Sequence, residues 1–409
     1  MLMSRLQRFR NFVAKMDPTA DPAWALERGF YVPPPVDLAH SVATRFELEP
    51  ASTHLIVGVV GSGKTTIALK VAERLQLTTR KVGDQVKFLD VSTRHLMDHE
   101  PLRGVLAALA GLDLTKSAEK RGKLPKEASE AALAIRRHAR GYTEWVPDYE
   151  GPPDYDEPPD EPPERPIHHP GVLKAPTNSS LPRDVSLLIE SLRILAQHYP
   201  GPRAHAIYLF DSLDRLASPT RFVEAVGDVR ALKQAGIGAM VIGPVRYAPS
   251  FDPTIQSVFE HIHFVGVVDP DTPSGSQFYG EVLRRRAHST VLPDNMLSPI
   301  ATASGGILRD LLGIARRAGE EAYVDGRDRI EQADVDVATR ILGESLAFGL
   351  DAAQLAVLRH LDAGKGFVIR GAGELALIEQ RRVIASGPGV WRVHPALRPV
   401  LAGIPEVAT

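Results

Sequence analysis

Eight residues near the start of the chain constrain its fold more than any other feature. The segment GVVGSGKT, residues 58–65, fits the pattern G-x-x-x-x-G-K-[ST]. Glycines at these places let backbone N–H groups turn toward a phosphate, and the positive end of the following helix favours the same anion. An apolar stretch, residues 53–60, leads in, and a helical stretch from 64 to about 75 leads out, as the motif requires. The sequence therefore predicts a phosphate-binding loop for a nucleoside triphosphate.

ATP with Mg²⁺ is the expected ligand of this loop. Lys64 would reach the β- and γ-phosphates, and the Thr65 hydroxyl would ligate the Mg²⁺. A glycine-rich turn without a ligand is the alternative, and the flanking strand and helix disfavour it. The predicted nucleotide-binding residues are those of the loop and the first helical turn: Gly58, Gly61, Ser62, Gly63, Lys64, Thr65 and Thr66.

A second apolar stretch, AIYLF at residues 206–210, ends in Asp211. A Mg²⁺–nucleotide site needs a carboxylate at the end of a nearby strand, so Asp211 is predicted to hold the ion together with Thr65. Three residues on, Asp214 is the candidate general base, which must lie within about one water of the attacking nucleophile. The alternative role of Asp214 is structural, as an ion-pair partner of Arg215 or a cap of the next helix.

Apolar strand-like runs alternate with helical patterns along residues 30–272. This alternation predicts an α/β fold, a parallel sheet of the P-loop NTPase kind with helices on both faces. Residues 273–350 are helical only, which predicts a helical lid. Residues 351–409 carry helices and a two-stranded hairpin, which predicts a small winged-helix-like α+β domain. Residues 1–29 predict a short helical segment that docks on the body or caps it.

One stretch of the chain, about residues 142–182, is acidic and proline-rich. Residues 144–164 hold nine acidic side chains and no Lys or Arg, so the rest of the chain has 48 basic and 41 acidic residues. Such a composition buries little apolar surface, which predicts a disordered, solvated insertion. The insertion is either a spacer or an acidic arm that covers a basic surface until a partner displaces it.

The 409-residue chain has no cysteine. This excludes disulfides, thiolate zinc sites and cysteine nucleophiles, and it fits a reducing cytoplasm. No apolar run approaches the roughly 18 residues of a membrane span. We therefore expect a cytoplasmic protein that makes no use of a membrane.

The loop followed by a strand that ends D-S-L-D-R, residues 211–215, resembles the AAA+/STAND group of P-loop ATPases, with its KAP-like and origin-recognition-like members. The segment GGILR, residues 305–309, is similar to the start of the sensor 2 helix in origin-recognition and clamp-loader-type proteins. The resemblance covers about residues 30–350. It implies that Arg309 touches the γ-phosphate from the lid, and that Arg246 is a sensor or a finger acting on a neighbouring subunit. An ordinary surface ion pair is the alternative for either arginine.

Two positions depart from that group. Ser212 stands where many AAA+ proteins have a Glu that activates water, and the strand at residues 238–242 is followed by Gly243-Pro244 with no polar side chain. Both departures predict slow hydrolysis. Neither concerns the residues that bind phosphate.

The leading hypothesis is a slowly hydrolysing ATPase that acts as a nucleotide-dependent switch. It would control homo-oligomerisation or the binding of a protein partner, in bacterial defence or signalling. A DNA-associated loader or initiator is the second hypothesis; it has weaker support, resting on a mildly basic body and the winged-helix-like domain. The basic run at residues 284–286 is either a solvated face or a contact with nucleic acid or another subunit. The third is a scaffold that ATP stabilises and that never hydrolyses it.

Overall fold

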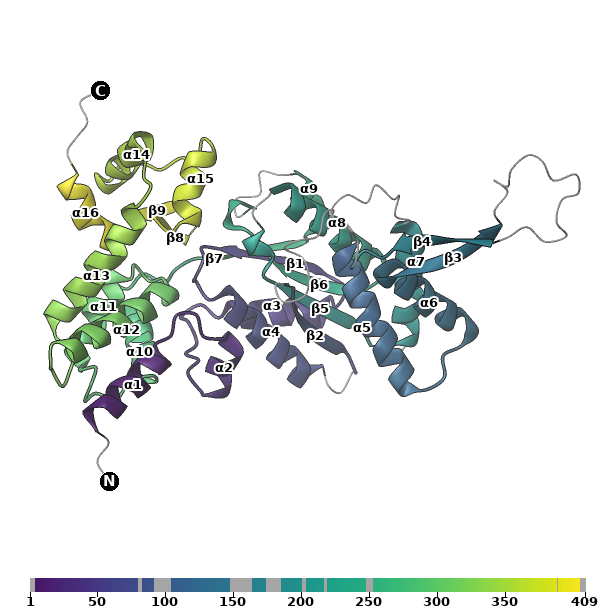
Figure 1. Cartoon of the computed structure of the whole chain (residues 1–409), viewed down its shortest axis with the longest axis horizontal. Helices are drawn as coiled ribbons and strands as arrows, with labels where there is room; N and C mark the ends of the chain where they lie inside the picture. Colours follow the sequence, from purple (N-terminus) through teal and green to yellow (C-terminus); the bar gives the residue numbers. More distant parts are fainter. Residues whose placement is uncertain are drawn as a thin grey trace, which may run out of the picture.

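Five parallel strands form the central sheet of the protein. The computed structural model describes residues 4–79, 83–91, 104–147, 164–173, 185–200, 204–216, 219–247, 253–387 and 389–404. Every neighbouring pair of strands is parallel, so all five carboxyl ends lie at the same edge. The predicted fold class, a parallel α/β sheet of the P-loop NTPase kind, is confirmed (Figure 1). Across the sheet the strands run β2 (Gln85–Asp90), β5 (Ala206–Asp211), β6 (Gly238–Ile242), β1 (Thr53–Gly58) and β7 (His261–Val265).

Strands β1, β5 and β6 are buried along their whole length, since helices cover both faces of the sheet. On one face, α3 (Leu38–Leu48) and α4 (Lys64–Thr78) share a hydrophobic cluster with the strands. None of the helices in the described stretches has the length and apolar character to span a membrane. The cluster on the other face is built by α5 (Val105–Arg121), α6 (Lys126–Arg140), α7 (Val185–His198), α8 (Pro219–Gln234) and α9 (Pro253–Val258).

Two parts of the acidic and proline-rich insertion pair with each other as a two-stranded ribbon. Strand β3 (Gly141–Pro147) pairs antiparallel with β4 (Glu164–Pro170), and the ribbon projects at one end of the molecule (Figure 1). The Tyr142 ring stacks on His169 with ring centroids 4.5 Å apart. The prediction that residues 142–182 would not fold is therefore wrong at the ribbon, because strand pairing satisfies the backbone where the composition offers little apolar burial. The most acidic part, residues 148–163, lies outside the described residues, as do residues 174–184.

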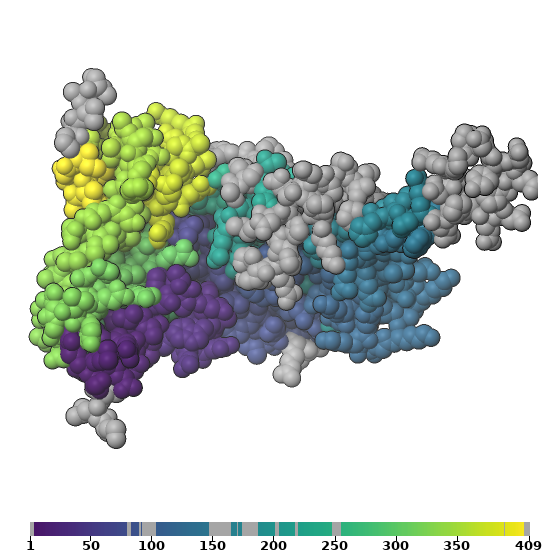
Figure 2. Space-filling model, in the orientation of Figure 1, coloured from purple at the N-terminus to yellow at the C-terminus, as the bar shows by residue number. Residues whose placement is uncertain are grey.

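A bundle of four helices lies where the sequence predicts a lid, and it is called the lid below: α10 (Pro273–Arg284), α11 (Leu297–Ala303), α12 (Leu308–Val324) and α13 (Gln332–Ala347). The N-terminal helix α1 (Arg5–Lys15) joins this bundle and buries Phe9 and Phe12 in its core. The Arg5 guanidinium donates to the carbonyl oxygen of Tyr323 in α12 at 2.9 Å. Figure 2 shows the purple N-terminal segment lying against the green lid. The start of the chain and residues 273–350 thus share one hydrophobic core.

The basic run at residues 284–286 takes part in contacts within the molecule. Arg285 donates to the carbonyl oxygens of Gly29 and Tyr31, and Arg286 Nη1 donates to Phe30 O at 3.1 Å. Burial lowers the pKa of Arg286 to about 10. These hydrogen bonds hold the segment between α2 (Pro22–Glu27) and α3 against the lid. Two of the three arginines therefore bind backbone, which weakens the case for a basic nucleic-acid surface here.

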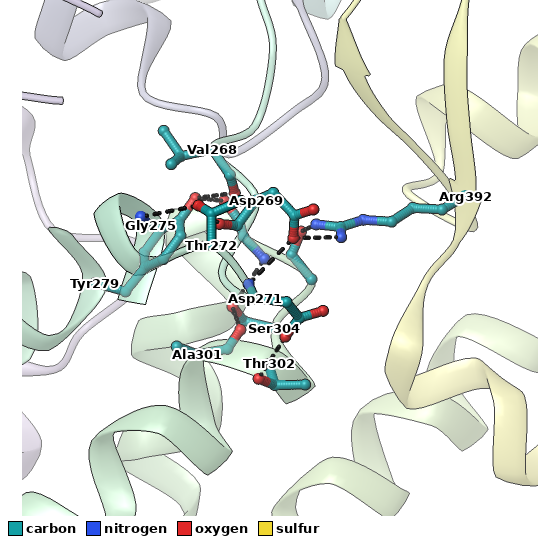
Figure 3. Close-up of polar contacts among 12 residues, drawn as sticks. Val268, Asp269, Asp271, Thr272, Gly275, Tyr279, Ala301, Thr302, Ser304 and Arg392 are labelled. Carbon is teal, nitrogen blue, oxygen red and sulfur yellow. Dashed lines mark hydrogen bonds and ion pairs between the residues drawn. The ribbon is translucent and has the colours of Figure 1, made fainter. Parts of the chain in front are cut away.

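The C-terminal part contains two helices and a hairpin, as the sequence predicts: α14 (Ala352–Asp362), α15 (Ala372–Glu379), β8 (Val383–Gly387) and β9 (Val390–Val393). A further short helix, α16 (Arg398–Gly403), was not predicted. Its hairpin lies against the segment that joins the sheet to the lid, since the Val267 N–H donates to Ala385 O at 3.1 Å. From β9, Arg392 Nη1 donates to Asp269 Oδ1 at 2.8 Å (Figure 3). Burial alone would raise the pKa of Asp269, but the hydrogen bonds from Arg392 and the Asp271 N–H outweigh it and lower the pKa. The C-terminal part therefore contacts the segment that joins the sheet to the lid.

Candidate nucleotide-binding site

The loop between β1 and α4 has the backbone of an anion cradle. Gly61 and Gly63 have φ angles of 86° and 96°, a left-handed conformation that glycine adopts without strain. Gly63 is the N-cap of α4, and no side chain caps that helix in the described part of the chain. The first N–H groups of α4, at residues 64–66, therefore point toward the loop as donors for a phosphate. The predicted residues Thr65 and Thr66 lie in this first turn.

Lys64 lies buried inside the loop, with 5% of its side chain exposed. Its Nζ donates to Gly58 O at 3.0 Å and to Val59 O at 3.1 Å. It also forms an ion pair with Asp214 Oδ2 at 2.9 Å. An ammonium has three hydrogens, and these three acceptors take them all. A phosphate must therefore replace at least one of these partners, and Asp214 is the one that carries a competing negative charge.

The loop offers polar groups that fit a triphosphate. The Ser62 hydroxyl is buried and has no hydrogen-bond partner among the described residues. A buried hydroxyl without a partner costs free energy, so its presence here favours a ligand that supplies one. Together with the open N–H groups of the first turn, it fits a bound polyphosphate.

Asp211 and Thr65 are the residues that would hold Mg²⁺. Asp211 is the last residue of β5, its side chain is buried, and its Oδ1 accepts the Ser212 N–H at 2.7 Å. Ser212 has a φ of 72°, an uncommon angle outside glycine, so the chain bends sharply here. Within the described ranges, no three His, Asp or Glu side chains gather as a metal site. A Mg²⁺ with two protein ligands takes the rest from phosphate and water, as is usual for this ion.

Asp214 lies beside the loop lysine, as its distance to Lys64 shows, and not in an ion pair with its neighbour Arg215. It occupies a short 3₁₀ turn, Leu213–Arg215, directly after β5. Its carboxylate lines a cavity of about 170 Å³ together with Gly58 and Val60 of the loop. Of the two roles considered for Asp214, the structure favours the one within the site.

Arg309 brings the lid onto the phosphate-binding loop. Its N–H donates to Gly61 O at 3.3 Å. A Cβ added at Gly61 would lie 2.7 Å from the Arg309 Cβ, so only glycine fits under the start of α12. Burial lowers the pKa of Arg309, and the nearby guanidinium groups of Arg381 and Arg215 lower it further. The carboxylates of Asp310 and Asp214 act in the opposite direction, so positive and negative groups both lie near Arg309.

Arg246 pairs with a residue that the sequence did not point to. It lies in a 3₁₀ turn, Val245–Tyr247, after β6, and its Nε and Nη2 both contact Glu379 Oε1, at 2.8 and 2.7 Å. Glu379 is the last residue of α15 in the C-terminal part. Both side chains line the cavity beside Asp214. The contact spans 133 positions of sequence, so no local pattern could have revealed it.

The end of β6 offers no polar side chain to orient a water. The strand is followed by Gly243 and Pro244, and a Cβ at Gly243 would lie 2.7 Å from Phe222 Cζ. A larger residue has no room there. The structure thus gives a packing reason for the departure noted in the sequence.

Comparisons with known proteins add only distant likenesses. No family model matches the chain, and no curated protein matches its sequence. Among solved structures, the Aeropyrum pernix ORC2 protein in its ADPNP–ADP complexes is 17% identical, with 91% of this chain and 96% of that chain covered and a TM-score of 0.43. Drosophila ORC bound to DNA is 14% identical, with 98% and 83% covered and a TM-score of 0.43. The Thermotoga maritima RuvB Holliday junction branch migration motor is 14% identical, with 88% and 87% covered and a TM-score of 0.38. At such scores these likenesses support no conclusion about this chain.

Proposed function

We propose that this protein is an ATPase that binds ATP with Mg²⁺ and hydrolyses it slowly, as an AAA+/STAND-like switch. One observation carries the proposal: the first turn of the lid helix α12 packs directly on the phosphate-binding loop, through Arg309 and Gly61. A γ-phosphate in the loop would lie between the core and this arginine. The angle of the lid would then depend on the nucleotide.

The residues of the chain have separate tasks in this proposal. Lys64 leaves Asp214 and binds the β- and γ-phosphates, while Thr65 and Asp211 hold the Mg²⁺, which neutralises phosphate charge. Asp214 then accepts a proton from the attacking water. The bond between the β- and γ-phosphates breaks, which gives ADP and phosphate. Slow turnover follows because Ser212, directly after Asp211, has no carboxylate to activate water, and the end of β6 offers no group to orient the water.

The switch would act through assembly. Lid closure through Arg309 would favour a homo-oligomer or a complex with a protein partner. The C-terminal winged-helix-like part would move with the segment between sheet and lid that it contacts. A cytoplasmic role in bacterial defence or signalling fits such a module.

Mass photometry with ATP, ADP and a non-hydrolysable ATP analogue, paired with phosphate release, tests the proposal. We expect the analogue to shift the mass distribution and ADP to reverse it, with phosphate released at a low rate. Equal distributions in all three nucleotides would refute the switch.

The two other hypotheses give different outcomes in the same experiment. Turnover that DNA stimulates and that falls steeply with salt would support the DNA-associated loader. Assembly with ATP but no phosphate release at all would support the scaffold.

A further inference from the structure

Glu379 brings a negative charge from the C-terminal part to the rim of the nucleotide site. Its carboxylate and the Arg246 guanidinium are mostly withdrawn from solvent, with 31% and 23% of their side chains exposed. The cavity that they line also contains Gly58, Val60 and Asp214. One small space is thus bordered by the phosphate-binding loop, by the core and by α15.

This cavity lies on the side of the loop where a third phosphate is expected. Lys64 Nζ is 3.0 Å from Gly58 O and 2.9 Å from Asp214, and both of these residues line the cavity. In a phosphate-binding loop, the lysine reaches the β- and γ-phosphates. The diphosphate end of a nucleotide would occupy the loop itself, and a γ-phosphate would extend toward Arg246 and Glu379.

The turn after α15 holds Glu379 in place. Arg381 has a φ of 64° and pairs with the buried Asp310, the neighbour of Arg309. Arg382 is buried and donates to Leu346 O at 2.7 Å and to Phe348 O at 2.6 Å. A non-glycine residue at positive φ is strained and persists only where its surroundings hold it. The backbone that carries Glu379 is therefore fixed to the lid.

We propose that Glu379 is a specificity-determining residue that makes the closed C-terminal part favour a nucleoside diphosphate over a triphosphate. The inference rests on the proposed function. A γ-phosphate entering the cavity meets the carboxylate of Glu379 and competes with it for Arg246. Because coupling between two sites is reciprocal, a bound triphosphate weakens the hold of α15 on the core by the same factor. ATP thus loosens the C-terminal part, and ADP leaves it docked.

Calorimetric titration of ADP and of a non-hydrolysable ATP analogue tests this inference. In Glu379→Gln the side chain keeps its size and loses its charge, and Arg246 becomes available. We expect the affinity for the analogue to rise about tenfold and that for ADP to change less than about twofold. Glu379→Asp keeps the charge and should keep the preference for ADP. Glu374→Gln, on the same helix but not in the cavity, is the matched control and should behave as the wild type.

The outcomes separate the two proposals. If the wild type binds neither nucleotide, both the proposed function and the role of Glu379 are wrong. If the wild type binds both, and Glu379→Gln leaves the ratio of affinities unchanged, only the role of Glu379 is wrong. A melting temperature within the range of the other variants shows that Glu379→Gln is folded.

Discussion

The two sides of the phosphate-binding loop are built differently. On the binding side, backbone N–H groups, Ser62 and Lys64 come from one short stretch of chain, and the lid closes over it through Arg309. On the hydrolysis side, the groups come from distant segments and neutralise one another, Asp214 with Lys64 and Glu379 with Arg246. The proposed function therefore predicts that affinity and turnover are separable. The first turn of α4 and Ser62 offer donors to a phosphate, whereas the charged groups are held in pairs.

Lys64→Ala should have the largest effect, because it removes the charge at the centre of the binding side. We expect the affinity for ATP and ADP to fall about 100-fold or more, as several charge-assisted hydrogen bonds are lost together. Calorimetry measures this. Lys70→Ala, on the next turns of α4, removes a lysine that pairs with Glu73 and should change little. Retained affinity in Lys64→Ala would contradict the division of the loop into two sides, since the nucleotide would then bind elsewhere.

Asp214→Asn should separate the two sides. It removes the general base and releases Lys64 from its ion pair, so binding should be kept or tightened while phosphate release falls about 100-fold. Phosphate release at saturating ATP, with calorimetry beside it, measures both. Asp294→Asn, an exposed lid residue paired with Arg284, is the control. Unchanged turnover in Asp214→Asn would favour a protein that binds ATP without Asp214 as a base.

Arg309→Ala should weaken the link between the binding side and the lid. We expect the affinity for the ATP analogue to fall about 30-fold and that for ADP to fall less, since a hydrogen bond to a charged group contributes about 1.5–3 kcal/mol. Arg316→Ala removes an exposed arginine from the same helix, where it pairs with Glu320, and serves as the control. An equal loss for both nucleotides would mean that Arg309 does not read the γ-phosphate.

The smallest effect on nucleotide binding is expected at the end of β1 that lies away from the loop, where a histidine cluster concerns the stability of the sheet. Burial, together with nearby His261 and Arg45, lowers the pKa of His54 to about 2 and that of His263 to about 4. His54 Nδ1 and His263 Nε2 lie 2.9 Å apart. Unfolded histidine titrates near 6.5, so the unfolded chain binds more protons below that pH.

Stability should therefore be full above about pH 6.5 and fall as the pH drops toward 4, by about 1–3 kcal/mol for each pH unit. Urea unfolding at several pH values measures it. His263→Gln should flatten this dependence, whereas His198→Gln, at the end of α7, should not. A flat profile in the wild type would show that the cluster does not couple protonation to folding.

Local elements were largely predictable from the sequence. Helix α6 and strand β6 have the bounds that their periodicity and apolar runs predicted, residues 126–140 and 238–242. The loop at residues 58–65 was predictable because its chemistry depends on neighbouring residues. The ribbon at the insertion was not, since composition does not reveal which separated segments pair as strands. The sequence predicted that the N-terminal helix docks on the body or caps it. It did not predict that α1 packs in the lid, because an amphipathic pattern does not indicate which surface the helix covers.

By itself, the sequence determined the phosphate-binding loop, the parallel sheet behind it and the carboxylates at the end of β5. These follow from short-range patterns, because glycine conformation, apolar periodicity and the position of an acid after a strand act within a few residues. Only the tertiary structure decided which partner each charge has. It placed Asp214 on Lys64 and Glu379 on Arg246, and the second pair brings the C-terminal part to the nucleotide site. It also packed the backbone of Arg309 on Gly61. Such contacts depend on how separate units pack, and no local pattern in the chain records that.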